Sequence, residues 1–295
     1  MARQLFVPFT EWRPILQAVK SLSPDFVFDG VDLLASLSKL SSLLSMCKDS
    51  DTGDIHFHLT LVHNTLIISN EGRMPEKDTM LTKVHRLNSV GNDFEEAFTE
   101  WPQGLEDSDS HVRVLQYDLG HLNCVISAGV DACLGKSVST QDTQPTGEST
   151  FTGSRLMISR GFKTDSPVAE IKASCDIWPR TLVQLWFSRA DAFIGGDVTP
   201  ERKYILVNKI EIKDTADLCD EWETDEENQT ALRRLTALIS QLREIVRGTK
   251  DKQCYIIREG TWPHLSNQLH VFTVENGEAP GFRNDVGKYW RGGPE

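Results

Sequence analysis

The sequence has no long hydrophobic run and no closely spaced cysteine pair. None of its apolar stretches approaches the roughly 20 residues that a membrane-spanning helix needs. Residues 1–6 also lack the apolar core of a secretory signal. The six cysteines include no C-x-x-C pair, so the pattern favours ordinary reduced thiols over a disulfide framework or a zinc site. These absences predict a cytoplasmic protein without a membrane partner.

Basic side chains are also outnumbered by acidic ones, 31 to 43. The formal net charge is −12, which argues against a broad, nonspecific nucleic-acid surface, and no DNA partner is expected. A local basic groove remains compatible with this charge. Acidic side chains are concentrated between residues 217 and 227, where Asp220, Glu221 and Glu223 lie close together. This segment is either a solvated surface or a pocket for a cationic ligand.

Hydrophobic spacing predicts the order of the main elements. Apolar residues three and four apart predict helices, and alternating apolar residues predict strands. The expected helices cover about 12–21, 29–47, 91–99, 182–194 and 227–247. The expected strands cover about 55–68 (a hairpin with one wet face), 113–119, 123–133, 168–174, 204–212 and 254–258. This order predicts an α+β fold in which a mixed sheet is flanked by helices.

The chain is expected to form one domain over residues 1–295. Within it, residues 1–28 mix aromatic residues with prolines and are expected to form an arm that includes the first helix. Residues 136–154 are rich in Ser, Thr, Gln and Gly, which predicts a mobile loop. The Gly-rich segment 275–295 is expected to be a loose tail.

The stretch that points to a functional site is Glu170-Ile171-Lys172. Because side chains alternate along a strand, Glu170 and Lys172 point to one face and Ile171 to the other. A carboxylate can hold a divalent cation, and a nearby ammonium can polarise a water or face a developing negative charge. A solvated Glu–Lys pair would have the same spacing, so the interpretation depends on the residues around it.

Three further residues make a catalytic interpretation more specific. Asp131 ends the strand that precedes the loop, Gln184 lies on the helix after Lys172, and Glu95 lies on helix 91–99. In this order the motifs resemble those of the PD-(D/E)XK nuclease superfamily. Over about residues 90–190 the match resembles its decapping-nuclease (DXO-like) branch. That resemblance implies that Glu95, Asp131 and Glu170 would bind Mg²⁺ and that Lys172 would orient the attacking water.

One position departs from that branch. Where the branch has Glu-x-Asp, this chain has Gly129-Val130-Asp131, so one metal-facing carboxylate is absent. Loss of a carboxylate ligand weakens the binding of a divalent cation. The departure therefore favours a repurposed site.

The full chain also resembles the fungal arginine-containing cyclodipeptide synthases. The shared segments are Gly91–Thr99, Tyr117–Leu122, Glu170–Lys172, Gln184–Ser188 and Trp222-Glu223. The resemblance implies an aminoacyltransferase of fungal secondary metabolism that forms a cyclo-Arg-Xaa dipeptide from arginyl-tRNA and a second aminoacyl-tRNA. It implies no cofactor and no metal ligands. The acidic D-D-x-x-E motif of that family is matched only partly, by Asp220–Thr224.

Cyclodipeptide synthesis would need little more than positioning and proton transfer. An aminoacyl ester is already activated, so the enzyme must place an amine, deprotonate it and stabilise an oxyanion. The acids could hold the arginine guanidinium or act as the base, and Lys172 could face the oxyanion. The catalytic candidates are Glu95, Asp131, Glu170 and Lys172. The substrate-binding candidates are Gln184, Asp220, Glu221 and Glu223.

A row of arginines is the candidate RNA-binding surface. Arg233, Arg243 and Arg247 fall on the side of helix 227–247 opposite its apolar stripe. Such a row could contact the phosphates of RNA, or it could be a solvated face with local ion pairs to Glu244.

Three functions therefore stay open at this point. The first is the tRNA-dependent synthase. The second is an RNA nuclease or decapping-type hydrolase, which would require Mg²⁺. The third is a catalytically inactive pseudonuclease that binds RNA through the inherited cleft.

Overall fold

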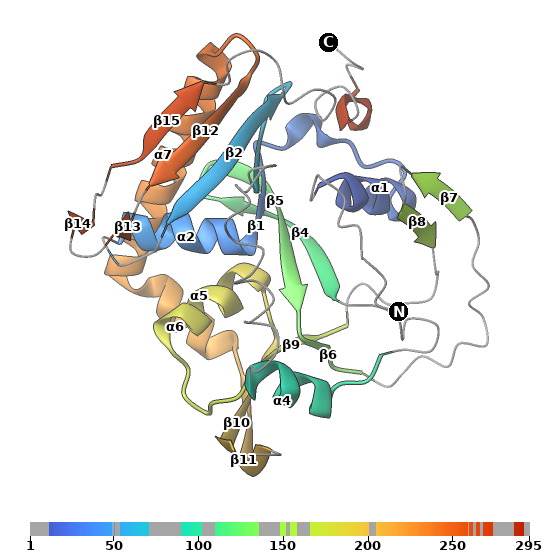
Figure 1. Cartoon of the computed structure of the whole chain (residues 1–295), viewed down its shortest axis with the longest axis vertical. Coiled ribbons are helices and arrows are strands. Elements are labelled where there is room, and N and C mark those ends of the chain that lie inside the picture. The colour runs from blue at the N-terminus through green and yellow to red at the C-terminus, as the bar shows by residue number, and fades with distance from the viewer. Residues whose placement is uncertain are drawn as a thin grey trace.

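The computed structural model describes residues 12–48, 50, 54–70, 90–101, 110–135, 148–151, 154–157, 166–200, 205–258, 260–261, 264–265, 268–273 and 286–291. Within these ranges the chain forms a seven-stranded sheet, a four-stranded sheet and two short two-stranded sheets (Figure 1). Helices flank the larger sheets. The predicted α+β fold with a mixed sheet is confirmed.

The seven-stranded sheet organises the main core. Its strand order is β15-β12-β2-β3-β1-β5-β4. β1 runs parallel to both of its neighbours, and the remaining pairs are antiparallel. The strands are β1 (Leu33–Ser36), β2 (Ile55–Val62), β3 (Thr65–Asn70), β4 (His111–Leu119), β5 (Leu122–Val130), β12 (Gln253–Arg258) and β15 (His270–Thr273).

The four-stranded sheet has the order β11-β10-β9-β6. β9 and β10 are parallel, and the two outer pairs are antiparallel. Its strands are β6 (Ala132–Cys133), β9 (Val168–Lys172), β10 (Ala192–Pro200) and β11 (Ile205–Asp214). The two-stranded sheets pair β7 (Glu148–Phe151) with β8 (Ser154–Met157) and β13 (Gly260–Thr261) with β14 (His264–Leu265). Since β5 ends at Val130 and β6 begins at Ala132, Asp131 is the residue that joins the two larger sheets.

Helices bury both faces of the seven-stranded sheet. On one face lie α2 (Leu37–Cys47), α5 (Pro179–Ser188), α6 (Ala216–Thr224) and α7 (Glu226–Gly248). On the other lie α1 (Trp12–Leu22) and the short helices η1 (Phe28–Gly30) and η4 (Gly287–Tyr289). The adjacent residues Leu33 and Leu34 of β1 are both fully buried, one in each of these two apolar clusters. A remaining helix, α4 (Val90–Phe98), packs on the four-stranded sheet.

The structure corrects three of the predicted elements. Residues 33–36 form β1 instead of the start of a helix, because a short, fully apolar run is compatible with either element. Phe193 and Ile194 belong to β10, because α5 stops before Arg189, which has a left-handed backbone (φ 52°). The hairpin has no continuous solvent-exposed face. β2 lies between β12 and β3, and His56 is the one exposed residue of β2.

Both expected loose ends pack on the sheet where the structure describes them. Trp12 and Leu16 of α1 are fully buried. Trp290 is 3% exposed, and its Nε1 donates to Thr65 Oγ1 at 2.9 Å. Most of the predicted mobile loop, residues 136–147 and 152–153, lies outside the described residues, and its end forms the β7–β8 hairpin. No helix in the described ranges is long and apolar enough to cross a membrane.

Candidate functional site

Asp131 fixes the junction of the two sheets against β9. Its Oδ2 accepts a hydrogen bond from the backbone N–H of Ile171 at 2.8 Å and another from Lys172 Nζ at 3.3 Å. The hydrogen bond from the backbone N–H positions the Asp131 carboxylate independently of the neighbouring side chains. The structure thus brings Asp131 to the strand that contains Glu170 and Lys172.

Lys172 connects two carboxylates. Its Nζ forms ion pairs with Glu170 and with Asp131, and it also donates to the carbonyl oxygen of Ile171 at 3.0 Å. Glu170 is 7% exposed, whereas the side chain of Lys172 is 31% exposed. Both acids contact one ammonium, so their oxygens converge on one small region at the end of β9.

Negative charge is in excess in this cluster. Burial, and then the charge of Asp131, raise the pKa of Glu170, and Lys172 offsets only part of this. Burial, and then Asp131, also raise the pKa of Glu95, which is half-buried on α4. For Lys172, burial would lower the pKa, but Glu170 and Asp131 together outweigh it and the net pKa is raised. Three carboxylates therefore share one ammonium, an arrangement that an added cation would relieve.

Glu95 is positioned by the residue before it. Phe94 is 1% exposed and packs on Gly196 of β10, where an added Cβ would lie 2.2 Å from the ring. Only glycine allows α4 to approach β10 this closely. Phe98 lies one turn further along the same side of α4 and packs on Phe94, with ring centroids 4.8 Å apart, but as the last residue of the helix it is 46% exposed.

Gly196 is the site-positioning residue that the sequence reasoning missed. A glycine inside a strand often marks the close approach of another segment. The doublet Gly195-Gly196 within β10 is that signal. A Cβ at Gly195 would lie 2.6 Å from the carbonyl oxygen of Ser174, so both glycines are constrained by neighbours.

Gly196→Ala is expected to destabilise the protein by about 1–3 kcal/mol, because the new methyl group overlaps the Phe94 ring and forces α4 away. Denaturant unfolding measures the change. Gly91→Ala is the matched control: it lies on α4 itself, and its added Cβ meets nothing within 4 Å. Equal unfolding free energies for the two variants would contradict the proposed contact.

The arrangement fits a divalent cation held by two carboxylates. Asp131 and Glu170 converge on Lys172 Nζ, and Mg²⁺ in proteins is commonly bound by one or two carboxylates together with water and substrate phosphate oxygens. Among the residues that the structure describes, no three or more His, Cys, Asp or Glu side chains are placed to hold a metal ion by themselves. The site thus suits a cation whose coordination is completed by water or phosphate.

Within the described residues, the predicted substrate-binding residues form no hydrogen bond or ion pair with this cluster. Asp220 and Glu221 are exposed on α6, and the carboxylate of Glu223 accepts a hydrogen bond from Trp186 Nε1 at 2.9 Å. In the described part of the chain, Gln184 of α5 makes no hydrogen bond or ion pair with the acidic cluster. Their role in substrate binding therefore stays a prediction.

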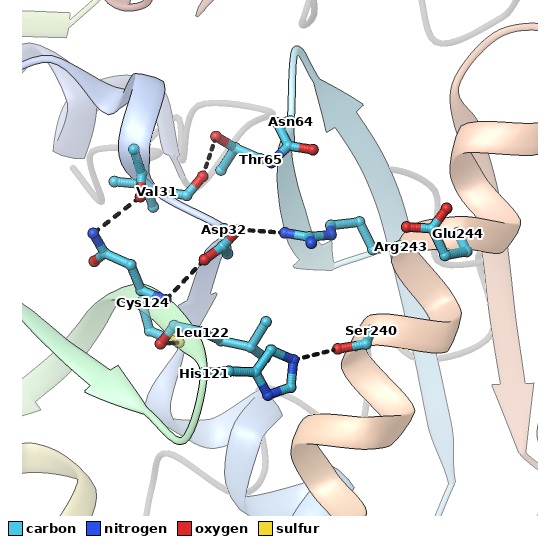
Figure 2. Close-up of polar contacts among 12 residues, drawn as sticks. Val31, Asp32, Asn64, Thr65, His121, Leu122, Cys124, Ser240, Arg243 and Glu244 are labelled. Atoms are coloured by element: carbon cyan, nitrogen blue, oxygen red, sulfur yellow. Dashed lines mark hydrogen bonds and ion pairs between the residues drawn. The ribbon is translucent and has the colours of Figure 1, made fainter.

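The predicted arginine row is engaged within the protein. Arg233 pairs with Glu226 at 2.6 Å, and Arg247 pairs with Glu244 and donates to Asn64. Figure 2 shows Arg243 reaching from α7 to Asp32, at the start of β1. Glu244 is the local partner that the sequence suggested, whereas Asp32 and Asn64 lie in distant segments that helical spacing alone cannot reveal.

Arg243→Ala is expected to lower the free energy of unfolding by about 1–3 kcal/mol. The side chains of Arg243 and Asp32 are only 17% and 23% exposed, so the variant leaves a mostly buried carboxylate without its cation. Arg233→Ala is the control, because that side chain is 59% exposed and an exposed ion pair contributes about 1 kcal/mol or less. If urea unfolding shows the same loss of unfolding free energy for both variants, the Arg243–Asp32 pair contributes no more to stability than an exposed ion pair.

Solved structures with a similar fold include those of Rai1 and Dxo1 proteins. Rai1 of Candida albicans in complex with pU5 and Mn²⁺ has a TM-score of 0.58 at 12% identity, covering 95% of this chain and 79% of that chain. Rai1 of Scheffersomyces stipitis in complex with (3'-NADP)⁺ and calcium has a TM-score of 0.59 at 13% identity, covering 94% and 78%. Dxo1 of K. lactis in complex with manganese has a TM-score of 0.51 at 10% identity, covering 89% and 71%.

These comparisons establish the fold, since identities this low show nothing finer. The expected DXO-like core is confirmed at that level, and nothing among the matches supports the expected cyclodipeptide synthase. No curated protein matches the chain by sequence. Residues 3–279 match the family described as Domain of unknown function (DUF8563), and the chain therefore belongs to that family.

Proposed function

We propose that the protein is a divalent-cation-dependent hydrolase of RNA, acting on phosphodiester or 5'-end phosphate bonds. The observation that carries this proposal is the convergence of Asp131 and Glu170 on Lys172 Nζ, at the joint between the two sheets. The shared fold adds support, because the Rai1 structure from Candida albicans contains pU5 and Mn²⁺.

The residues of the cluster divide the chemistry among them. A divalent cation bound by Asp131 and Glu170 would polarise a phosphoryl oxygen and lower the pKa of a bound water. Lys172 would hold the attacking water or a phosphate oxygen by charge-assisted hydrogen bonds. Glu95 has a pKa raised by burial and then by Asp131, so it is suited to accept the proton of the water.

RNA binding without hydrolysis is the second candidate function, and Gly129 favours it. This residue stands where the DXO-like motif has a carboxylate, so the metal site has one acidic ligand fewer. In the same site the ammonium of Lys172 already pairs with Asp131 and Glu170. A site of this kind could retain RNA while holding the cation too weakly for turnover.

Synthesis of a cyclo-Arg-Xaa dipeptide from aminoacyl-tRNAs is not favoured by any contact. The α6 acids that were expected to bind substrate make no hydrogen bond or ion pair with the cluster within the described residues. Expression in a microbial host with metabolite profiling remains the direct test of that activity. An arginine-containing diketopiperazine in the culture would replace the hydrolase proposal.

The hydrolase proposal is tested with purified protein and end-labelled RNA. Substrates with 5'-hydroxyl, 5'-monophosphate, 5'-triphosphate and capped ends are incubated with Mg²⁺, Mn²⁺ or EDTA, and products are resolved on gels. We expect cation-dependent cleavage of at least one substrate. Binding of RNA measured by fluorescence anisotropy, with no cleavage in either cation, would overturn the hydrolase and support the binding function.

A further inference from the structure

The edge strand β11 has an unusual amphipathic surface. β11 is the outermost strand of the four-stranded sheet, and Figure 1 shows β10 and β11 together at the bottom of the view. Exposed edge strands offer unpaired N–H and C=O groups to another strand. Ile210 is 43% exposed and Ile212 is 71% exposed, so apolar side chains face solvent on this edge.

A β-bulge places Val207 on the same face of β11 as Ile210 and Ile212. Lys209 pairs with Asp197 but Val207 pairs with Val198, so Asn208 is the extra residue. Directly paired residues share a face of the sheet. Since Ile194, Gly196 and Val198 alternate on one face of β10, their partners also lie there, and these are Ile212, Ile210 and Val207.

The other face of β11 carries charges of both signs, together with the exposed Leu206. Lys209, Glu211 and Lys213 pair with Asp197, Gly195 and Phe193, and all three lie on that face. Glu211 makes ion pairs with both lysines of its own strand. Lysines on an edge usually discourage pairing with another strand, but here the acid between them offers a partner to a lysine of a second strand.

We propose that two copies of this chain associate through β11, antiparallel and centred on Ile210, so that their four-stranded sheets join across a two-fold axis. In this register Lys209 of each copy lies opposite Glu211 of the other, which forms two cross-strand ion pairs. On the apolar face the two Ile210 side chains meet at the axis. The exposed Phe98 lies on the helix that packs over this face, so it extends the apolar surface.

Other registers are less complementary. A register centred on Glu211 would set the two Glu211 carboxylates against each other and Lys209 against Lys213. A register centred on Ile212 would also pair unlike charges, Glu211 with Lys213, but it would set Asp214 against Ile210 and bring the first turn of α6, which begins at Ala216, beside the partner strand. The Ile210 register pairs Lys209 with Glu211 and keeps the two Ile210 side chains together without bringing α6 beside the described part of the partner strand.

Charge exchange tests the register in solution. Sedimentation velocity over a wide range of protein concentration is expected to show a dimer for the wild type. Glu211→Lys should weaken dimerisation about tenfold or more, because both cross-strand pairs become repulsive. The double variant with Lys209→Glu and Glu211→Lys should recover it, because the charges are exchanged symmetrically. A wild type that is monomeric throughout would overturn the proposal, and so would a dimer that Glu211→Lys leaves unchanged.

Cysteine cross-linking tests the register of the two strands independently of charge. Facing residues of antiparallel strands have Cα atoms about 4.5–5.5 Å apart, within reach of a disulfide. Ile210→Cys should therefore form a disulfide-linked dimer on mild oxidation. The matched control, Ile212→Cys, should not, because its copies lie about 13 Å apart in this register. Both are made with Cys133→Ser, since Cys133 is an exposed thiol. Cross-linking at 212 but not at 210 would overturn the register.

Discussion

Glu170→Gln is expected to lower the rate of RNA hydrolysis by about 100-fold or more while leaving RNA binding within a few-fold of wild type. Glutamine keeps the shape of the side chain but removes the negative charge that would hold a cation beside Asp131. The RNA itself gains most of its affinity from contacts with phosphates, which this change does not remove. Single-turnover cleavage and fluorescence anisotropy measure the two quantities separately.

The fold is expected to survive this substitution. Burial and then the charge of Asp131 raise the pKa of Glu170 above its ordinary value of 4.5, so the ionised carboxylate costs folding free energy as the pH rises past that value. Glutamine removes that cost but also removes the ion pair with Lys172. Because the two effects oppose each other, the free energy of unfolding should change by about 1 kcal/mol or less.

An acid outside the cluster provides the matched control. Asp251 is exposed in the turn before β12, and Asp251→Asn makes the same acid-to-amide change there. Its hydrolysis rate should equal that of wild type. If Glu170→Gln cleaves RNA as fast as Asp251→Asn, the acidic cluster is not the catalytic site.

The fold was predictable where the hydrophobic pattern is compatible with only one type of secondary structure. The 23 residues of α7 repeat apolar positions over several turns, and β4 and β5 alternate across a short connection, so both were found. β1 was missed because its four residues bury both faces of a central strand and therefore show no alternation. The packing of α1 and Trp290 depends on contacts between the two ends of the chain, which no local pattern contains.

The sequence predicted which residues form the candidate site, but not the contacts that position them. Alternation places Glu170 and Lys172 on one face, and the end of a strand places Asp131 beside them. The contact of Phe94 with Gly196 joins residues about a hundred positions apart. The partner of Arg243 is Asp32, which lies immediately before β1 and far from α7 in the sequence. Such pairs are fixed by the tertiary packing of elements, so the sequence suggested only the local partner Glu244 for the arginine row and not Asp32.

Gly129→Glu is expected to raise the affinity for Mg²⁺ or Mn²⁺ about tenfold, and cation-dependent hydrolysis with it. The new carboxylate would lie two residues before Asp131, on the strand that leads into the site. The position can accept a side chain, because a Cβ at Gly129 meets nothing within 4 Å. Its backbone also avoids the positive φ that, among the described glycines, only Gly120 adopts.

The effect of charge is separated from the effect of size by Gly129→Gln. Glutamine fills the same space without adding a negative charge, so it should leave both cation affinity and hydrolysis at the wild-type level. Cation affinity is read by isothermal titration calorimetry and hydrolysis by cleavage at limiting cation concentration. Equal behaviour of the two variants would show that a missing carboxylate does not limit this site. A gain confined to Gly129→Glu would mean that the fold still holds the geometry for a fuller metal site and that one glycine sets its strength.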